Sequence, residues 1–471
     1  MAFQTIPINI AGPSYQDRSR PLSSQETRNW YHEVVPSGKN QFVIKSFPGQ
    51  TVFGSVAVGT ERNGTNMAEV EFRVVGNTLY QVDSAGTHTA RGTIPGTARC
   101  IFANDGVNLF IVTGTSVFWY DGSTVVQVTD PDIDGSKAVT IINNQFVYTK
   151  DTLYVVSDVG DGSSASGLNA AGAEVSPDNL VRAYAFDQVV YLLGERTAQL
   201  IYNSGVGSPP FDNVEGSLIS IGCAAIHSVA NTKDAIYWLG SDRSIYRARG
   251  GAEERISSTA IANAVEGYGR VDDAFAYTFV FQGKEFYAID FPDAGQTWCL
   301  NEELGTDGWF ELSAGTEGGD YNIASLVNVF GKNLIGDKTT GDLYELDINR
   351  FDNNGSVYQR RRVLASISGE NIGNRGKRLE MSRFELIMET GVGLITGQGE
   401  DPKIMLEYST DGGKSWREGD WLRIGRLGET DLLVEWWQMM SFYDLMIRIT
   451  TSDAVDYSIY SGAIDIRLAG R

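Results

Sequence analysis

The segment NTLYQVDSAG, residues 77–86, places a short run of β-branched and aromatic residues directly before a turn that contains aspartate and glycine. This composition is typical of one strand of a β-hairpin and its turn. Similar segments recur with their aromatic residues roughly 35 to 55 positions apart, close to the length of a four-stranded propeller blade. They are SVFWYDGS around Tyr120, DTLYVVSD around Tyr154, QVVYLLGE around Tyr191, AIYWLGSD around Tyr237, KEFYAID around Tyr287 and GDLYELD around Tyr344.

This recurrence predicts an all-β fold in which residues 51–350 form an irregular β-propeller of about six or seven blades. Blades that stack radially leave only short, protected strand edges, so a long antiparallel chain avoids pairing with other copies. An elongated stack of β-sandwiches is the alternative architecture for the same pattern.

The pattern changes after about residue 350. RFELIMET, residues 383–390, alternates Phe384, Leu386 and Met388 with more polar positions, and three later segments alternate in a similar way. Alternation of this kind is typical of strands with one buried face. Residues 351–471 are therefore predicted to form a C-terminal β-sandwich.

Residues 1–50 differ from both regions because they hold five of the chain's 12 prolines. Proline donates no backbone hydrogen bond and is confined to edges within sheets. We expect an extended N-terminal arm that docks on this chain or on a neighbouring one.

The chain carries 38 basic and 59 acidic residues, a net charge of −21. Such a surface repels duplex phosphate, which argues against a protein that reads DNA sequence. It is compatible with simple solubility, and also with a conduit along which DNA slides without sticking.

The three cysteines are far apart in the sequence and form no CxxC pair, as is typical of reduced core residues in a protein that folds in the cytoplasm. The N-terminal residues show no signal-peptide pattern, and no segment has the length of a membrane span.

YSTDGGKSW, residues 408–416, has the spacing S-x-D-x-G-x-x-W of the Asp-box hairpins in sialidase propellers, with Ser409, Asp411, Gly413 and Trp416 at the four positions. The carboxylate can accept N–H groups of its own turn, the glycine can adopt positive φ, and the tryptophan can cover the hairpin. In sialidases these hairpins lie away from the catalytic centre. The motif therefore favours a structural turn.

A glycan-binding or sialidase-like propeller is the alternative function. A sialidase would also need an arginine cluster, a Tyr–Glu nucleophile pair and an aspartic acid, and the family's Arg-Ile-Pro signature is missing. The three histidines are isolated, and no nucleophile elbow, phosphate-binding loop or HExxH motif occurs. We therefore predict that the protein is not an enzyme and that it has no catalytic residue and no cofactor.

DPDIDG, residues 130–135, places Asp130, Asp132, Asp134 and Gly135 at the spacing of a calcium-binding loop. The twelfth position holds Ile141 where such a loop needs a bidentate glutamate. The segment is a calcium candidate, but an acidic turn between blades is favoured, and no metal is predicted.

One basic island interrupts the acidic chain near the junction of the two regions. It could pair with an acidic neighbouring subunit or touch nucleic acid, or it could be a locally balanced surface. Its members are Arg360, Arg361, Arg362, Arg375, Lys377 and Arg378.

ETRNWYHEVVPSGKNQFVIKSFPGQ, residues 26–50, resembles the opening of the tail hub proteins of short-tailed bacteriophages, also called packaged-DNA stabilisation proteins or tail accessory factors. Later segments follow in the same order, namely GNTLYQVD, YWLGSDRSIYR, QTWCL, DGWFEL and EYSTDGG. The residues that carry the opening pattern are Asn29, Tyr31, Glu33, Gly38, Lys39, Pro48 and Gly49.

The resemblance implies a structural virion protein that folds in the host cytoplasm and joins the phage tail. It implies a homo-oligomer, a hexameric ring below the portal and its adaptor protein, that seals and stabilises packaged DNA and channels its ejection. Tailspikes or tail fibres and a plug or needle protein are the implied partners. Double-stranded DNA passes without sequence-specific binding, and no membrane is involved.

Overall fold

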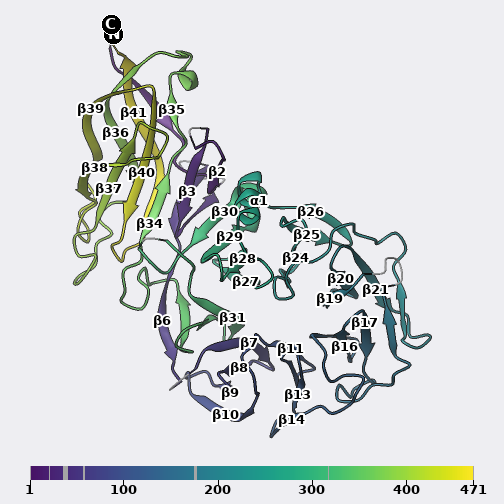
Figure 1. Cartoon of the computed structure of the whole chain (residues 1–471). Coiled ribbons are helices and arrows are strands. Elements are labelled where there is room, and N and C mark those ends of the chain that lie inside the picture. Colours follow the sequence, from purple (N-terminus) through teal and green to yellow (C-terminus); the bar gives the residue numbers. More distant parts are fainter. Residues whose placement is uncertain are drawn as a thin grey trace.

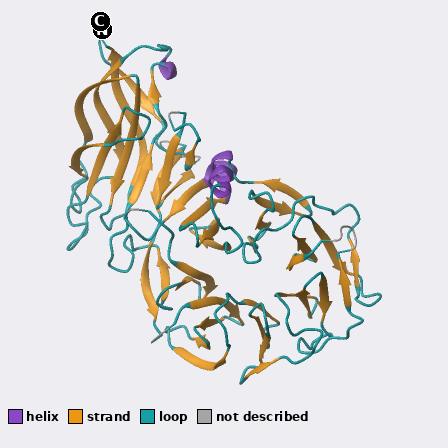
Figure 2. Ribbon diagram, in the orientation of Figure 1, coloured by secondary structure: helices purple, strands orange, loops and turns teal. Residues whose placement is uncertain are grey.

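A ring of β-sheets beside an elongated β-sandwich makes up the molecule (Figure 1). The computed structural model describes residues 2–20, 22–35, 41–56, 59–173, 178–316 and 318–469. Strands account for 51% and helices for 4% of it, and the few helical turns are short (Figure 2). The predicted all-β fold, a propeller followed by a C-terminal sandwich, is confirmed.

The propeller has seven four-stranded antiparallel blades within the described residues. The first strands of most successive blades contact one another around the ring axis. The first three blades are β7 (Glu61–Met67), β8 (Val70–Val75), β9 (Thr78–Val82) and β10 (His88–Thr93); β11 (Ile101–Asn104), β12 (Leu109–Val112), β13 (Val117–Tyr120) and β14 (Val125–Gln127); and β15 (Ala138–Ile142), β16 (Gln145–Lys150), β17 (Leu153–Val156) and β18 (Ala170–Gly172).

The next three blades follow in chain order, with the helix α1 (Thr259–Glu266) before the sixth blade and the 3-10 helix η1 (Glu302–Gly308) inside it. Their strands are β19 (Leu180–Phe186), β20 (Val189–Gly194), β21 (Ala198–Asn203) and β22 (Phe211–Asn213); β23 (Ala230–Asn231), β24 (Ile236–Leu239), β25 (Ile245–Arg249) and β26 (Ala252–Arg255); and β27 (Phe275–Phe281), β28 (Lys284–Phe291), β29 (Gln296–Asn301) and β30 (Trp309–Leu312).

The seventh blade closes the ring with a strand from the other end of the propeller sequence. Its strands β31 (Ile323–Val329), β32 (Lys332–Asp337) and β33 (Leu343–Asp347) are completed by β6 (Gly49–Gly54), which pairs antiparallel with β33. Because this blade takes strands from both ends of the propeller segment, the ring opens only if the pairing of β6 with β33 breaks.

The sandwich consists of two sheets that also draw on the N-terminal segment. One sheet has the order β39-β36-β41-β5-β4 with β1 on β41; the other runs β3-β34-β40-β37-β38, with β2 on β3 and β35 on β40. The bounds are β1 (Gln4–Ile8), β2 (Tyr15–Gln16), β3 (Ser24–Arg28), β4 (Trp30–Val34), β5 (Phe42–Ser46), β34 (Arg360–Val363), β35 (Ile367–Ser368), η2 (Glu370–Ile372), β36 (Leu379–Met388), β37 (Lys403–Ser409), β38 (Arg417–Arg423), β39 (Val434–Phe442), β40 (Asp444–Thr451) and β41 (Ser458–Leu468).

The described part of residues 1–50 lies against its own chain. Strand β1 pairs with β41 (Gln4↔Ile466), and the hairpin of β4 and β5 extends the same sheet. The segment thus supplies strands to both sandwich sheets and to the last blade. The division of the chain into residues 1–50, 51–350 and 351–471 remains a proposal about which segments fold as units.

The sandwich core follows the alternation in the sequence. Phe384, Leu386 and Met388 on β36 are buried, whereas Ile387 between them is exposed. Burying each such side chain stabilises the fold by roughly 1.5–3 kcal/mol. The core also takes Trp30 from the N-terminal segment, so the sandwich is complete only with these residues.

Glu71 on β8 is a buried carboxyl group in the first blade. Its side chain has no exposed surface, and neither oxygen has a hydrogen-bond partner among the described residues. Burial raises the pKa of this carboxyl to about 8, because the charged form cannot be solvated. The folded protein therefore holds a proton that the unfolded chain releases above its ordinary pKa.

The Glu71→Gln variant is expected to have a flatter pH dependence of stability. In the wild type, Glu71 alone contributes a fall in the free energy of unfolding of up to ~1.4 kcal/mol per pH unit as pH rises from about 5 to about 8, because its carboxyl loses the proton first in the unfolded state. Urea denaturation at several pH values measures this slope. The exposed Glu69→Gln change should leave it unaltered, and an unchanged slope in Glu71→Gln would contradict the assignment.

Candidate functional site: the seam between propeller and sandwich

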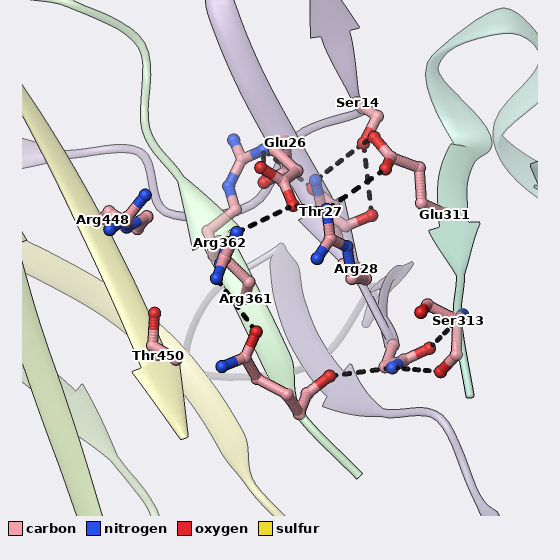
Figure 3. Close-up of polar contacts among 12 residues, drawn as sticks. Ser14, Glu26, Thr27, Arg28, Glu311, Ser313, Arg361, Arg362, Arg448 and Thr450 are labelled. Carbon is pink, nitrogen blue, oxygen red and sulfur yellow. Dashed lines mark hydrogen bonds and ion pairs between the residues drawn. The ribbon is translucent and has the colours of Figure 1, made fainter. Parts of the chain in front are cut away.

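The two parts of the molecule meet along β3, which lies between β30 of the sixth blade and β34 of the sandwich (Figure 3). Strand β3 pairs antiparallel with β34 (Glu26↔Val363) and parallel with β30 at Arg28↔Glu311. One N-terminal strand therefore joins a propeller blade and a sandwich sheet into one continuous sheet. We call the residues on these three strands and their flanking loops the seam.

Asn29, directly after β3, makes the central polar contact of the seam. It is fully buried with φ 53°, a left-handed conformation that asparagine tolerates better than most residues. Its Nδ2 donates to the carbonyl oxygens of Ser313 at 2.9 Å and Gln359 at 2.8 Å, and its Oδ1 accepts from the Ser313 N–H at 3.0 Å. One side chain thus connects the end of the sixth blade to the chain entering β34.

Charged groups surround this contact in a buried network. Arg28 lies 2.6 Å from Glu26 and 3.8 Å from Glu311, and the Ser14 hydroxyl donates to Glu311 at 3.0 Å. Burial, and then repulsion from Glu26, raise the pKa of Glu311 to about 7, and Arg28 opposes this shift. Removing one member of such a network leaves a buried charge without its partner, which is strongly destabilising.

Arg362 on β34 ties the N-terminal loop to the sandwich. It is 1% exposed and donates to the carbonyl oxygens of Ile10 at 2.8 Å and Pro13 at 3.1 Å, and to Thr27 Oγ1 at 2.8 Å. Burial lowers the pKa of its guanidinium to about 9. Gly12 permits this approach, because a Cβ there would lie 2.7 Å from Arg362 Nη2.

The basic island predicted from the sequence does not form one exposed surface. Arg360 and Arg362 are buried, because backbone carbonyl oxygens of the seam and its neighbouring loops converge on them, and Arg361 is half-buried with Glu26 4.0 Å away. Arg375, Lys377 and Arg378 are exposed after η2. A basic interface shared by all six residues, one of the possibilities raised by the sequence, is therefore not formed: two of them are buried, one is half-buried and three are exposed.

The residues of the opening pattern contact the sixth and seventh blades. Tyr31 on β4 packs edge-on against Phe286, with ring centroids 5.6 Å apart, and its hydroxyl donates to Gln282 at 3.2 Å. Burial raises the pKa of this hydroxyl. Glu33 lies 3.8 Å from Lys284. Pro48 is buried before β6, and Gly38 and Lys39 lie outside the described residues.

Gly49 begins β6 in close contact with the chain that follows β33. Its N–H donates to the Arg350 carbonyl at 2.6 Å, and a Cβ at this position would lie 2.0 Å from the carbonyl oxygen of Asp352. Any side chain here requires the backbone to move.

We expect Gly49→Ala to lower the free energy of unfolding by roughly 2–4 kcal/mol, because the added methyl group overlaps backbone that β6 must approach to close the ring. Gly269→Ala is the matched control, since its Cβ would have no neighbour nearer than 4.0 Å. Urea denaturation of both variants gives the comparison; equal stabilities would show that β6 does not need this contact.

The Asp-box residues contact one another. Asp411 Oδ1 accepts from the N–H groups of Lys414 at 2.9 Å and Ser415 at 3.0 Å, and Ser409 Oγ donates to it at 2.7 Å. Hydrogen bonds to the carboxylate lower the pKa of Asp411, and the bond from the Ser415 hydroxyl has the largest effect. Gly413 has φ 79° beside the Trp416 ring. The polar groups of the motif are thus used within its own turn.

DPDIDG forms the turn between the second and third blades. Asp130 accepts from the N–H groups of Asp132 at 2.8 Å and Ala165 at 3.1 Å, and Gly135 has φ 82°. The Lys150 ammonium donates to the Pro131 carbonyl at 2.5 Å, so backbone oxygens of this turn already face a positive charge. In the described ranges, no group of three or more His, Cys, Asp or Glu residues is arranged to hold a metal ion.

Sequence reasoning missed the partners of the seam on the propeller side. Glu311 and Ser313 lie close to Trp309 in a segment that reads as an ordinary strand, and Gln359 lies in a loop. No local pattern marks them, because their role depends on β3, which lies almost 300 residues earlier in the chain.

No helix of the described residues has the length and hydrophobicity to cross a membrane.

Two family models match the chain. The one described as bacteriophage P22 Gp10, beta-propeller, matches residues 4–350, and the one described as bacteriophage P22 Gp10, beta-sandwich, matches residues 367–467. No curated protein sequence matches significantly.

Several solved structures share a low overall likeness. The computationally designed Ika8 protein is 10% identical over 69% of this chain and 100% of its own, with a TM-score of 0.39. BamB from Moraxella catarrhalis is 10% identical over 73% and 96%, with a TM-score of 0.38. The extracellular domain of BT4673 from B. thetaiotaomicron is 9% identical over 82% and 48%, with a TM-score of 0.45, so this match spans about half of that chain. Likenesses at this level carry no argument about function.

Proposed function

Because this chain belongs to the bacteriophage P22 Gp10 family of tail hub proteins, we propose that it forms a hexameric ring below the portal and its adaptor protein. In this proposal the ring seals and stabilises packaged DNA and channels its ejection. It also anchors tailspikes or fibres and a plug or needle protein. The chain is a structural component of the phage tail, and we propose that it has no catalytic role and folds in the host cytoplasm.

The seam is the observation that best supports a sealing role. A ring that retains packaged DNA bears a load, and a hinge between propeller and sandwich would let each subunit deform. The continuous sheet through β3, together with the buried contacts of Asn29 and Arg362, couples the two parts of the chain. Such a junction suits a load-bearing subunit.

The path of DNA is proposed to lie between subunits. Inner strands of several blades line a cavity of about 220 Å³ near the propeller axis, and one water molecule takes up ~30 Å³ of liquid. That cavity holds only a few water-sized groups, so duplex DNA is not expected to pass through the propeller. A net charge of −21 per chain would let DNA slide past the ring without adhering to it.

The edge of the sandwich offers a surface for assembly. Trp437 and Met439 on the outer strand β39 are 69% and 63% exposed. Large exposed apolar side chains on an outer strand are typical of protein–protein contacts. We propose that β39 contacts a neighbouring subunit or a tail partner.

Trp437→Glu is expected to reduce incorporation of the chain into particles by about tenfold or more, because a charge cannot replace a large apolar anchor in a buried contact. The control is Val107→Glu, at an equally exposed position on the second blade. Quantifying the chain in purified particles measures both variants. Normal incorporation of Trp437→Glu would exclude β39 from the assembly contact.

The ring itself is tested by cryo-electron microscopy of intact particles with the chain labelled at its C-terminus. A sixfold ring of label between the adaptor and the tail tip is the expected result. Label in the capsid shell, or a different symmetry below the adaptor, would contradict the proposed position.

A further inference from the structure

The cavity near the propeller axis is lined by basic groups in an otherwise acidic chain. Arg99, which precedes β11, and Arg182 on β19 both line it, and His227 joins them. Among the lining residues that the structure describes, none carries a carboxylate. Two guanidinium groups therefore share a cavity of about 220 Å³ without an acid in its wall.

Neither arginine has an ion-pair partner in the described part of the chain. Arg99 donates to Asn63 Oδ1 at 3.3 Å and its Cζ lies 3.9 Å from the centre of the Phe275 ring. Arg182 donates to the Ile226 carbonyl at 2.8 Å, and its buried Nε has no hydrogen-bond partner among the residues that the structure describes. A guanidinium has five N–H donors, so most donors of both groups are unused by the protein.

Several other polar side chains of the wall already have hydrogen-bond partners, whereas the buried Tyr277 hydroxyl has none among the described residues. The Tyr184 hydroxyl donates to Asn231 Oδ1 at 2.6 Å, Asn231 Nδ2 donates to the Thr232 carbonyl at 2.9 Å, and Thr278 Oγ1 donates to the Asn231 carbonyl at 2.7 Å. Asn63 Nδ2 donates to the Cys100 carbonyl at 3.0 Å. The unused hydrogen-bonding groups of the cavity thus include the donors of two guanidinium groups and the Tyr277 hydroxyl.

The charges in the cavity act on one another. Burial is the main cause that lowers the pKa of Arg99 to about 10, and repulsion from Arg182 adds to it. Asp290, which does not line the cavity, opposes this shift. Burial, then Arg99 and Arg182, lower the pKa of His227 well below its usual value, so this imidazole is neutral at pH 7. Two like charges held near each other in a partly buried cavity repel, and a bound anion relieves that cost.

We propose that this cavity binds a small oxyanion of the phosphate or sulfate class between the guanidinium groups of Arg99 and Arg182. Arginine forks match oxyanions through paired, charge-assisted hydrogen bonds. The site is independent of the proposed tail function. Because the cavity is lined by residues of several blades, the anion contacts both Arg99, which leads into the second blade, and Arg182 on the fourth blade.

Titration calorimetry of the whole chain with inorganic phosphate, at constant ionic strength set with chloride, tests the site. We expect one saturable site per chain, and binding at least about tenfold weaker in Arg182→Gln because one fork is lost. Arg182→Lys keeps the charge without the fork and should fall between. Arg270→Gln, at an exposed arginine paired with Asp272, should bind as the wild type does.

Two further measurements keep the test decisive if a variant folds poorly. Crystals of the wild type soaked in selenate should show an anomalous selenium peak between the two guanidinium groups. A duplex oligonucleotide at the same phosphate concentration should produce no heat that depends on Arg182. Absence of phosphate binding by the wild type, a selenium peak only elsewhere, or Arg182-dependent binding of the duplex would overturn the assignment.

Discussion

Replacing Arg362 with alanine is expected to lower the free energy of unfolding by roughly 3–5 kcal/mol. The guanidinium fills a buried space in the seam and donates to the carbonyl oxygens of Ile10 and Pro13 and to side chains of β3. Truncation leaves these acceptors buried without donors and adds a cavity. The N-terminal loop should then separate from β34, and the sandwich should lose β1 and β3 together.

Denaturation followed by tryptophan fluorescence measures this effect, because Trp30 lies in the sandwich core and Trp309 begins β30. Arg378→Ala is the matched control, since it removes an exposed arginine of the same basic island and surface changes are usually within ~0.5 kcal/mol. If both variants unfolded alike, Arg362 would not hold the seam.

Asn29→Ala is the second variant for which a large loss is expected, roughly 3–5 kcal/mol. The substitution removes three hydrogen bonds that link the sixth blade, β3 and the chain entering β34. It also places a residue with a Cβ but no local hydrogen bond at φ 53°. The expected result is earlier unfolding in urea, with propeller and sandwich no longer unfolding in one transition.

Two companion variants at Asn29 separate the causes. Asn29→Gly removes the hydrogen bonds but tolerates the left-handed backbone, so it should be about 1 kcal/mol more stable than the alanine variant. Asn29→Asp keeps the acceptor for the Ser313 N–H but loses both donors. Wild-type stability in either companion would show that the side-chain donors are not what joins the two parts.

Local patterns in the sequence were sufficient for the fold class. Tyr120, Tyr154 and Tyr191 lie on the middle strands β13, β17 and β20 of successive blades, so their spacing reflects the length of a blade. The alternation at Phe384 and Leu386 reflects a single buried face. These features depend on neighbours within one hairpin, so a single sequence displays them.

The closure and the seam depend on contacts that no local pattern records. β6 pairs with β33 and β3 with β30, each almost 300 residues away. Arg360 and Arg362 suggested an exposed island because unpaired charges are rarely buried. The structure buries them because carbonyl oxygens from distant loops converge there, and only the tertiary fold brings those acceptors together.

The most direct test of the tail hub function is electron microscopy of phage particles assembled without this chain, with the DNA retained in their heads quantified. Heads that package DNA, then lose it, and that carry no tail below the adaptor are the predicted result. Stable, full particles with complete tails would contradict the central claim that this chain closes the DNA-filled head.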